Sequence, residues 1–430
     1  MNLNTAPSAN RIHIGIFGKR NAGKSSIINA ITGQDLAIVS DIKGTTTDPV
    51  QKAMELLPLG PVVIIDTPGL DDDGDLGRLR IRKAYQVLNK TDIAVLVIDS
   101  STGITPEDKK ILESVRKKDI PYVIVLNKTD LSKEQLDENV LPAKTAAESI
   151  ISVSAVTGQN IGELKELIAR QVQSGTDKCR IVGDLISPED FIVLVVPIDE
   201  SAPKGRLILP QQQTIRDILE TGAAAIVVKE TELEKTLTDL GKKPSLVITD
   251  SQAFQQVAAI VPADIKLTSF SILFARYKGD LETLAKGAAA LDKLKDGDIV
   301  LISEGCTHHR QCNDIGTVKL PAWLKRHTSK ELTFEFTSGT EFPDDLSRYN
   351  CIIHCGGCML NDREMNYRIQ CAKDQDIPIV NYGIAIAHIN GILERSLECI
   401  SKPTCRYAAT RTRVRRRCND MPAAKPLQKI

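Results

Sequence analysis

The sequence predicts an α/β protein built from three consecutive domains. Short β-branched runs alternate with amphipathic helical patterns along most of its 430 residues, and this alternation is typical of parallel strands covered by helices. A chain of this length is expected to form roughly two to four domains, each with its own core. A polar stretch at Gln173–Asp184 marks the first boundary as a linker.

The first domain is expected over residues 1–173. Its strands are expected at Ile12–Phe17, Val62–Asp66, Ile93–Asp99, Tyr122–Asn127 and Ile150–Ser154. Helical periodicity occupies the segments Leu76–Leu88, Pro106–Lys117 and Ile161–Val172. These elements predict one parallel sheet with helices on its faces.

The second domain is expected over residues 185–262, where three strand–helix pairs follow one another without any Cys or His. Because it lacks candidate chemistry, we expect it to mediate assembly, with strands such as Phe191–Val196 pairing across a two-fold axis. The third domain, residues 263–400, is expected to open with a long helical pattern and to contain strands at Ile299–Ser303 and Cys351–His354. Residues 401–430 form a basic tail without apolar periodicity, which predicts disorder.

Composition excludes several classes of protein. The 55 basic and 55 acidic side chains cancel, which argues against binding nucleic acid with the whole surface. No apolar run approaches the roughly 18 residues of a membrane span, and the N-terminus is polar, so we expect a cytoplasmic protein that does not bind membranes. Nine of the ten cysteines lie beyond residue 300, and reduced cysteines crowded into one region indicate a metal site.

A glycine-rich segment, GKRNAGKS at residues 18–25, follows the first expected strand and opens a helix. In this context G-x-x-x-x-G-K-[ST] binds phosphates, because glycines let backbone N–H groups wrap around the anion. Lys24 is expected to neutralise the β- and γ-phosphates, and the Ser25 hydroxyl to coordinate Mg²⁺. The expected nucleotide contacts in this segment are Gly18, Asn21, Ala22, Gly23, Lys24, Ser25 and Ser26.

Three later segments complete a pattern for guanine nucleotides. Asp66 and Gly69 end an apolar strand, where a carboxylate can reach Mg²⁺ and a glycine amide can reach the γ-phosphate. Asp130 ends the segment NKTD, and its carboxylate can accept two N–H bonds from guanine, a donor pair that adenine lacks. The expected contacts in these segments are Asp66, Gly69, Asn127, Lys128, Asp130, Ser154 and Ala155.

Together these segments resemble the TrmE/Era-like branch of the Ras-type GTPases. The segment GTTTD at residues 44–48 is similar to switch I of that branch, except that Thr47 stands where the branch has Arg. The resemblance implies a P-loop GTPase domain that binds GTP. It also implies that Thr46 ligates Mg²⁺ together with Ser25 and Asp66, with Thr45 and Thr47 as alternatives.

The resemblance also implies that Asn21 coordinates a K⁺ ion beside the phosphates. Leu70 follows Gly69 at the position where Ras-like proteins have Gln, and an apolar side chain cannot orient the attacking water. Slow intrinsic turnover is therefore expected, with K⁺ supplying positive charge. The residues expected to act in catalysis are Lys24, Thr46 and Gly69.

A second constellation combines C-x-H at Cys306 and His308 with H-C-x-x-C at His354, Cys355 and Cys358. Each motif follows an expected strand, so in one parallel sheet both would emerge at the carboxyl edge, where sites commonly form. Three thiolates with two imidazoles suit a structural zinc site. Three thiolates with one exchangeable position equally suit a 4Fe–4S cluster.

The order of these two constellations resembles the HydF family of FeFe-hydrogenase maturation GTPases over nearly the whole chain to about residue 400. The resemblance implies a dimerisation domain over residues 185–262 and a 4Fe–4S domain over residues 263–400. It implies that Cys306, Cys355 and Cys358 hold the cluster, and that His308 or His354 occupies its fourth position. It further implies a homodimer that carries a diiron precursor, with FeFe-hydrogenase and radical-SAM maturases as partners.

Two alternative functions stay open. One is an RNA-directed GTPase of ribosome assembly or tRNA modification with a zinc module. The basic tail favours this function, whereas the scarcity of aromatic residues argues against nucleic-acid binding. The other is a GTP-regulated metal carrier for a different enzyme. Outside these motifs, Cys351 and Cys371 are expected in the core, and His388 is expected to be a core histidine with its hydrogen bonds satisfied.

Overall fold

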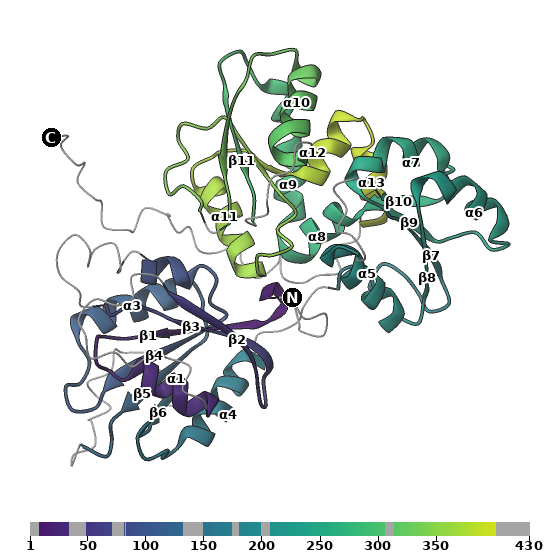
Figure 1. Cartoon of the computed structure of the whole chain (residues 1–430). Helices are drawn as coiled ribbons and strands as arrows, with labels where there is room; N and C mark the ends of the chain where they lie inside the picture. The colour runs from purple at the N-terminus through teal and green to yellow at the C-terminus, as the bar shows by residue number, and fades with distance from the viewer. Residues whose placement is uncertain are drawn as a thin grey trace. The chain divides into compact units, whose positions relative to one another are not determined.

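The computed structural model describes residues 8–33, 49–70, 81, 83–131, 149–173, 180–198, 207–305, 314–339 and 341–400. The chain divides into two compact units, Met1–Thr176 and Asp177–Ile430, which are drawn in Figure 1. Each unit is built from parallel strands and helices, so the α/β fold class predicted from the sequence is confirmed. No helix in the described ranges has both the length and the apolar character needed to cross a bilayer.

The first unit contains a six-stranded sheet in the order β2-β3-β1-β4-β5-β6, in which β2 runs antiparallel to β3 and the other pairs are parallel. The strands are β1 (Ile12–Phe17), β2 (Val50–Leu56), β3 (Gly60–Asp66), β4 (Ile93–Asp99), β5 (Tyr122–Asn127) and β6 (Ile150–Ser152). Its helices include α1 (Lys24–Thr32), α3 (Pro106–Lys117) and α4 (Ile161–Gln173).

The two faces of this sheet are covered by separate hydrophobic clusters. Along β4, Val95 and Val97 belong to one cluster, whereas Leu96 and Ile98 belong to the other. Side chains of a strand alternate between the two faces, so β4 is buried on both sides. This double burial explains why the central strands are continuous apolar runs. Because β3, β1, β4 and β5 are parallel neighbours in that order, their carboxyl ends lie along one edge of the sheet.

The second unit contains two four-stranded parallel sheets, in the orders β10-β9-β7-β8 and β12-β11-β13-β14. The first sheet consists of β7 (Phe191–Val195), β8 (Ala224–Val228), β9 (Leu246–Thr249) and β10 (Lys266–Ser269). The second consists of β11 (Ile299–Ser303), β12 (Thr333–Thr337), β13 (Cys351–His354) and β14 (Ile379–Asn381). The helices are α5 (Leu209–Glu220), α6 (Leu233–Asp239), α7 (Phe254–Ile260), α8 (Phe270–Lys278), α9 (Leu281–Ala288), α10 (Leu320–Thr328), α11 (Asp362–Asp374), α12 (Tyr382–Ile389) and α13 (Leu393–Leu397).

The long helical pattern expected from residue 263 is wrong at its start. Residues 266–269 form β10, which pairs with β9 of the first sheet, and helix α8 begins only at Phe270. Strand β10 is four residues long and three of these are polar, so it has too few residues to show an alternating pattern. One hydrophobic cluster includes Ile192 of β7 and Val300 of β11, so the two sheets share a core.

The expectation that Phe191–Val196 pairs across a two-fold axis is also wrong. Strand β7 lies between β8 and β9, with both of its edges already paired. Strand β8 is at the edge of this sheet and, among the described strands, pairs only with β7. Its Val227 is 45% exposed. The apolar edge available for pairing is therefore β8.

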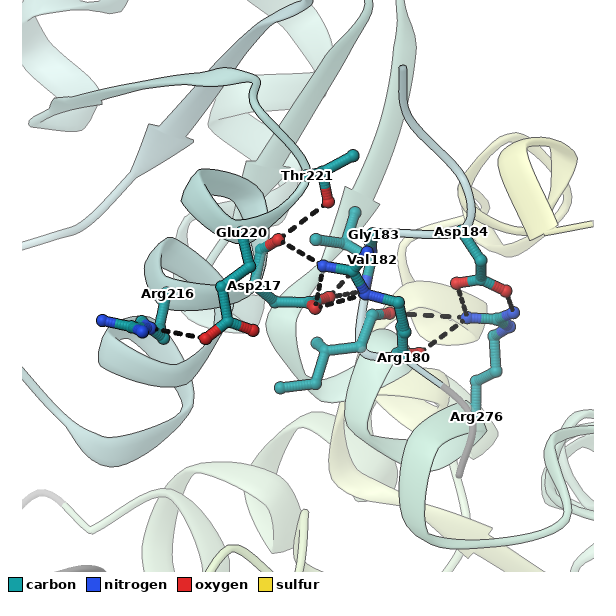
Figure 2. A network of polar contacts seen from close by, with 10 residues as sticks. Arg180, Val182, Gly183, Asp184, Arg216, Asp217, Glu220, Thr221 and Arg276 are labelled. Carbon is teal, nitrogen blue, oxygen red and sulfur yellow. Dashed lines mark hydrogen bonds and ion pairs between the residues drawn. The ribbon is translucent and has the colours of Figure 1, made fainter. Parts of the chain in front are cut away.

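Part of the expected linker is fastened to the second unit. The Asp217 carboxylate on α5 accepts hydrogen bonds from the backbone N–H groups of Val182 (2.8 Å) and Gly183 (2.7 Å) and from Arg180 Nε (2.9 Å), as Figure 2 shows. Arg276 on α8 donates to the Arg180 carbonyl at 3.1 Å and pairs with Asp184. A carboxylate shielded from water is tolerated when each oxygen has donors. The chain therefore enters the second unit at a fixed position.

Candidate functional site

The glycine-rich loop connects β1 to α1, and its backbone requires glycine at two positions. Gly18 has φ 145°, and a Cβ there would lie 2.2 Å from the Val97 carbonyl oxygen. Gly23 has φ 91°, and a Cβ there would lie 2.2 Å from Asn127 Nδ2. Asn21 adopts the left-handed conformation with φ 60° and is exposed. Three residues with positive φ within one six-residue stretch bend the backbone into a tight loop, as the binding of a phosphate by backbone N–H groups requires.

The charged residues of the loop lie where a phosphate and a cation would bind. Lys24 Nζ folds over the loop and donates to the carbonyls of Gly18 (3.0 Å) and Lys19 (2.8 Å). The Ser25 hydroxyl donates to Asp66 Oδ2 at 3.1 Å. Asp66 Oδ1 is buried and has no hydrogen-bond partner among the residues that the structure describes. Burial raises the pKa of Asp66, an effect that Lys24 and Ser25 oppose.

This arrangement fits a magnesium ion. A hydroxyl oxygen and a buried carboxylate oxygen without a donor are ligands that Mg²⁺ accepts, usually with phosphate oxygens and water completing its shell. Ser25 and Asp66 would hold the ion, and the charge of the ion would offset the burial that raises the pKa of Asp66. Ser26 is half-buried in the first turn of α1, and Gly69 is half-buried after β3. Thr46 lies outside the described residues.

The NKTD segment is tied to the phosphate loop and to the last loop of the sheet. Asn127 Nδ2 donates to the Ala22 carbonyl at 3.0 Å, and Asn127 Oδ1 accepts from the Ala155 N–H at 3.1 Å. The Ser154 hydroxyl donates to Asp130 Oδ1 at 2.6 Å. Asp130 itself is exposed. Lys128 pairs with Asp99 at 2.6 Å. Buried Asn127 thus connects the NKTD segment, which ends in Asp130, to the phosphate loop.

Leu70 is buried in the cluster that covers one face of the first sheet. Its side chain is committed to packing and is not directed at a nucleotide. This position is consistent with the expectation that the residue after Gly69 does not orient the attacking water.

The thiol loop follows β13 in the second unit. Strands β11 and β13 are parallel neighbours with Ser303 opposite His354, so the two strands end at the same edge of the sheet. Cys355 Sγ accepts from the backbone N–H groups of Gly305 (3.0 Å) and Gly357 (3.4 Å). Cys306 and His308 lie outside the described residues.

Gly305, after β11, and Gly357, in the thiol loop, lie where neighbouring side chains are too close for a Cβ. A Cβ at Gly305 would lie 2.7 Å from Leu360, and one at Gly357, which has φ 62°, would lie 2.5 Å from the sulfur of Met365. Close backbone approach with N–H donors directed at a cysteine sulfur is the environment that stabilises cluster thiolates. The loop therefore fits a metal cluster held by Cys355 and Cys358.

Without a metal, the thiols of this loop are protonated at neutral pH. Burial raises the pKa of Cys355 to about 11, and burial also raises the pKa of Cys358, an effect that Lys278 opposes. Metals bind the thiolate, so loading the site releases protons. Among the described cysteines, Cys351 and Cys371 are buried in the core as expected.

A buried lysine that belongs to none of the sequence motifs binds the backbone of the thiol loop. Lys278, the last residue of α8, is 2% exposed, and its Nζ donates to the carbonyls of Gly357 (3.2 Å), Cys358 (3.2 Å) and Leu360 (2.7 Å). Burial lowers the pKa of Lys278, an effect that nearby acidic groups oppose. Three carbonyls that converge on one ammonium group fix the course of the backbone around Cys358.

His354 is fully buried, and both nitrogens of its ring are engaged. Arg368 Nη1 lies 3.0 Å from Nε2, and Nδ1 lies 2.7 Å from the Cys355 carbonyl. Arginine can only donate, so Nε2 accepts and Nδ1 carries the proton. Burial and Arg368 lower the pKa of His354 to about 3. This geometry disfavours His354 as a cluster ligand and gives it the role of holding the Cys355 backbone.

Three protein families match successive parts of the chain. Residues 13–128 match the 50S ribosome-binding GTPase family, residues 181–279 the Hydrogen maturase F dimerization domain, and residues 282–399 the Hydrogen maturase F tetramerization domain. The boundary between the last two falls in the short connection between α8 and α9. Lys278 therefore belongs to one matched region and the thiol loop that it supports to the other.

Curated relatives match part of the chain. The tRNA modification GTPase MnmE of Heliobacterium modesticaldum is 39% identical over 158 residues, which is 36% of this chain and 33% of the relative. GTPase Der of Campylobacter concisus is 36% identical over 176 residues, 39% of this chain and 38% of the relative. The chain thus spans less than half the length of either relative.

Solved structures with a similar fold include a probable GTP-binding protein, engB, at 24% identity and a TM-score of 0.32, covering 38% of this chain and 99% of that one. Era of Aquifex aeolicus, crystallised with GDP and AlF₄⁻, has 23% identity and a TM-score of 0.33, covering 50% of this chain and 93% of that one.

Proposed function

Because the chain joins a GTPase domain to the dimerization and tetramerization domains of hydrogen maturase F, we propose that it is a GTP-hydrolysing scaffold for hydrogenase maturation. In this proposal it binds a 4Fe–4S cluster in its second unit and carries a diiron precursor, as cargo, to FeFe-hydrogenase in the cytoplasm. The observation that carries the proposal is the glycine-flanked thiol loop at the carboxyl edge of β11 and β13, in the same chain as a phosphate loop.

In the proposed cluster site, three iron positions are held by Cys306, Cys355 and Cys358, and His308 is the candidate ligand for the fourth. The bound cluster supplies an iron with an exchangeable ligand position, at which cargo can dock. The N–H groups of Gly305 and Gly357 stabilise the Cys355 thiolate, and Lys278 keeps the loop backbone in place. His354 and Arg368 tie that loop to Ser303 at the end of β11.

The experiment that tests the proposal is purification of the untagged full chain without oxygen, followed by iron, sulfide and zinc analysis and a hydrogenase activation assay. Brown protein with about four iron atoms per chain supports the cluster, and activation of an immature FeFe-hydrogenase supports the carrier role. Colourless protein that contains zinc and binds RNA would instead establish the alternative of an RNA-directed GTPase. The match to MnmE covers 33% of that relative, so it does not support RNA binding by this chain.

A potassium ion is expected to raise GTP turnover by roughly tenfold over sodium, because a cation beside the phosphates stabilises charge that develops in the transition state. The exposed, left-handed Asn21 and the buried Leu70 motivate this expectation. In Asn21→Ala the difference between the two salts should disappear. Steady-state phosphate release in matched KCl and NaCl measures it, with Arg20→Ala in the same loop as the control. Equal wild-type rates in both salts would remove the role of K⁺.

Dimer formation is proposed to occur through the edge of β8. Unpaired strand edges with apolar side chains are templates for pairing, and a charge placed there opposes it. Val227→Lys should therefore halve the mass of the assembly measured by light scattering. Leu219→Lys is a matched control, because Leu219 is 58% exposed on α5 in the same unit. Unchanged mass in Val227→Lys, or loss of assembly in both variants, would contradict pairing at β8.

A further inference from the structure

A third group of metal-binding side chains lies outside both sites described above. Asp292 in the short 3-10 helix Leu291–Lys293, His327 on α10 and His388 on α12 converge at one point of the second unit. His327 Nε2 lies 2.7 Å from Asp292 Oδ1, and His388 Nε2 lies 2.9 Å from Asp292 Oδ2. One ligand atom from each residue lies within 4.8 Å of the other two. His388 is thus half-buried in this group and not in the core, contrary to the sequence-based expectation.

The surroundings of the group favour a cation. His327 lies in the last turn of α10 and His388 in the last turn of α12, and the carboxyl end of a helix carries partial negative charge. Two helix ends and a carboxylate therefore concentrate negative potential at one point. Basic residues lie nearby in the chain as well: Arg326 adjoins His327, and Lys293 adjoins Asp292. Lys325, also on α10, has its Nζ paired with Glu331 at 3.0 Å.

The donor set selects the class of metal. Two imidazole nitrogens and one carboxylate oxygen suit Zn²⁺ and neighbouring divalent transition metals, with one position left for water. Mg²⁺ and Ca²⁺ prefer oxygen donors, and an iron–sulfur cluster requires thiolates. The three residues come from three different elements of one hydrophobic core, so the ligands are held in place without a metal. The half-exposed position lets an ion enter from solvent.

We propose that Asp292, His327 and His388 form a binding site for one divalent transition-metal ion of the zinc class, separate from the thiol loop. Binding replaces the two contacts to Asp292 by metal–ligand bonds and releases the proton on each Nε2 to water or to Nδ1. The bound ion joins the carboxyl ends of α10 and α12. The site does not depend on the proposed cluster or on GTP.

The test uses the untagged full chain with Cys306→Ser, Cys355→Ser and Cys358→Ser, so that zinc cannot bind the thiol loop. Titration with Zn²⁺ against a chromophoric chelator, without nucleotide, should find one tight equivalent. His327→Ala and His388→Ala should each weaken it by more than the roughly tenfold that losing an outer-shell partner costs. Asp292→Asn, which keeps the shape of an exposed side chain, should weaken it as well. Lys325→Ala is the control and should bind as the parent does.

Co²⁺ in place of Zn²⁺ identifies the donors, since nitrogen and oxygen ligands give visible bands without the near-ultraviolet charge transfer of thiolates. Thermal unfolding by circular dichroism shows which variants are folded, and zinc should raise the midpoint of the parent but not of Asp292→Asn. Absence of a tight equivalent in the parent would overturn the site. Binding that persists in folded His388→Ala and Asp292→Asn would also overturn it. If the wild-type protein proved to contain no 4Fe–4S cluster, these zinc-binding measurements would be unaffected.

Discussion

Replacing Cys355 or Cys358 by serine is expected to remove the iron–sulfur cluster and abolish hydrogenase activation, while GTP hydrolysis continues. Cys355 Sγ is the atom toward which two backbone N–H groups are directed, so its loss removes a ligand together with the sulfur that accepts both hydrogen bonds. The nucleotide site lies in the other compact unit. Iron and acid-labile sulfide, visible absorption and phosphate release measured on the same anaerobic samples check the three parts of this expectation.

Cys371→Ala is the matched control, because it removes a thiol from the core of the same unit but not from the loop. Its iron content should equal that of the wild type. Stoichiometric iron and sulfide in the variant with all three cysteines replaced would show that the cluster lies elsewhere. Zinc as the sole metal of the anaerobically purified wild type would show that the loop is a structural zinc site.

The pH dependence of thiol reactivity adds a check on the same loop. Burial raises the pKa of Cys355 to about 11, and the thiolate is the reactive form. Alkylation of the metal-free protein at Cys355 should therefore be slow at neutral pH and should accelerate as the pH rises toward about 11. Mass spectrometry of the modified peptide follows it, with an unstructured cysteine peptide as the reference. Equal rates for protein and peptide at neutral pH would contradict the raised pKa.

Asp130→Asn is expected to change base preference from guanine to xanthine by roughly a thousandfold or more, because a site built for a donor pair rejects a base that mismatches it. The carboxylate accepts the two N–H groups of guanine, whereas an amide offers an N–H to the carbonyl that replaces the exocyclic amine in xanthine. Ser154 keeps its hydrogen bond to either side chain. Competition of GTP, XTP and ATP for a fluorescent guanine nucleotide measures the change.

Asp119→Asn makes the same chemical substitution on the surface of the same unit, and its base preference should equal that of the wild type. Equal hydrolysis of ATP and GTP by the wild type would mean that Asp130 does not read the base. Retained preference for guanine in Asp130→Asn would mean that another group reads it.

The strands that could be predicted from the sequence are those buried on both faces. Ile93–Asp99, Tyr122–Asn127 and Ile299–Ser303 have the predicted bounds, because a doubly covered strand is a continuous apolar run. Strand β2 was missed, since it is antiparallel and mostly exposed, and its polar residues Gln51, Lys52 and Glu55 do not alternate with apolar ones. Strands β10 and β14 are too short to show a period. Such elements form because a neighbouring strand offers them a ladder of hydrogen bonds.

The residues of the candidate sites divide in the same way. The phosphate loop and the NKTD segment could be predicted, because each is a short contiguous motif whose spacing follows from its chemistry. Lys278 and Arg368 could not, since each meets its site through tertiary structure. Lys278 at the end of α8 has the sequence signature of an ordinary basic residue at a helix terminus. The hydrogen bond from its ammonium group to the Cys358 carbonyl becomes visible only in the folded chain, where α8 lies next to the loop that follows β13.

The thiol loop is held by contacts that do not need a metal: β11 pairs with β13, Lys278 binds three carbonyls, and Arg368 binds His354. Small zinc domains, in contrast, fold only around their ion. The chain is therefore expected to fold first and to receive iron afterwards. During iron starvation a cell would then accumulate the folded protein without its proposed cluster. Iron supply would change the fraction of the protein that carries a cluster, but not the total amount of folded protein.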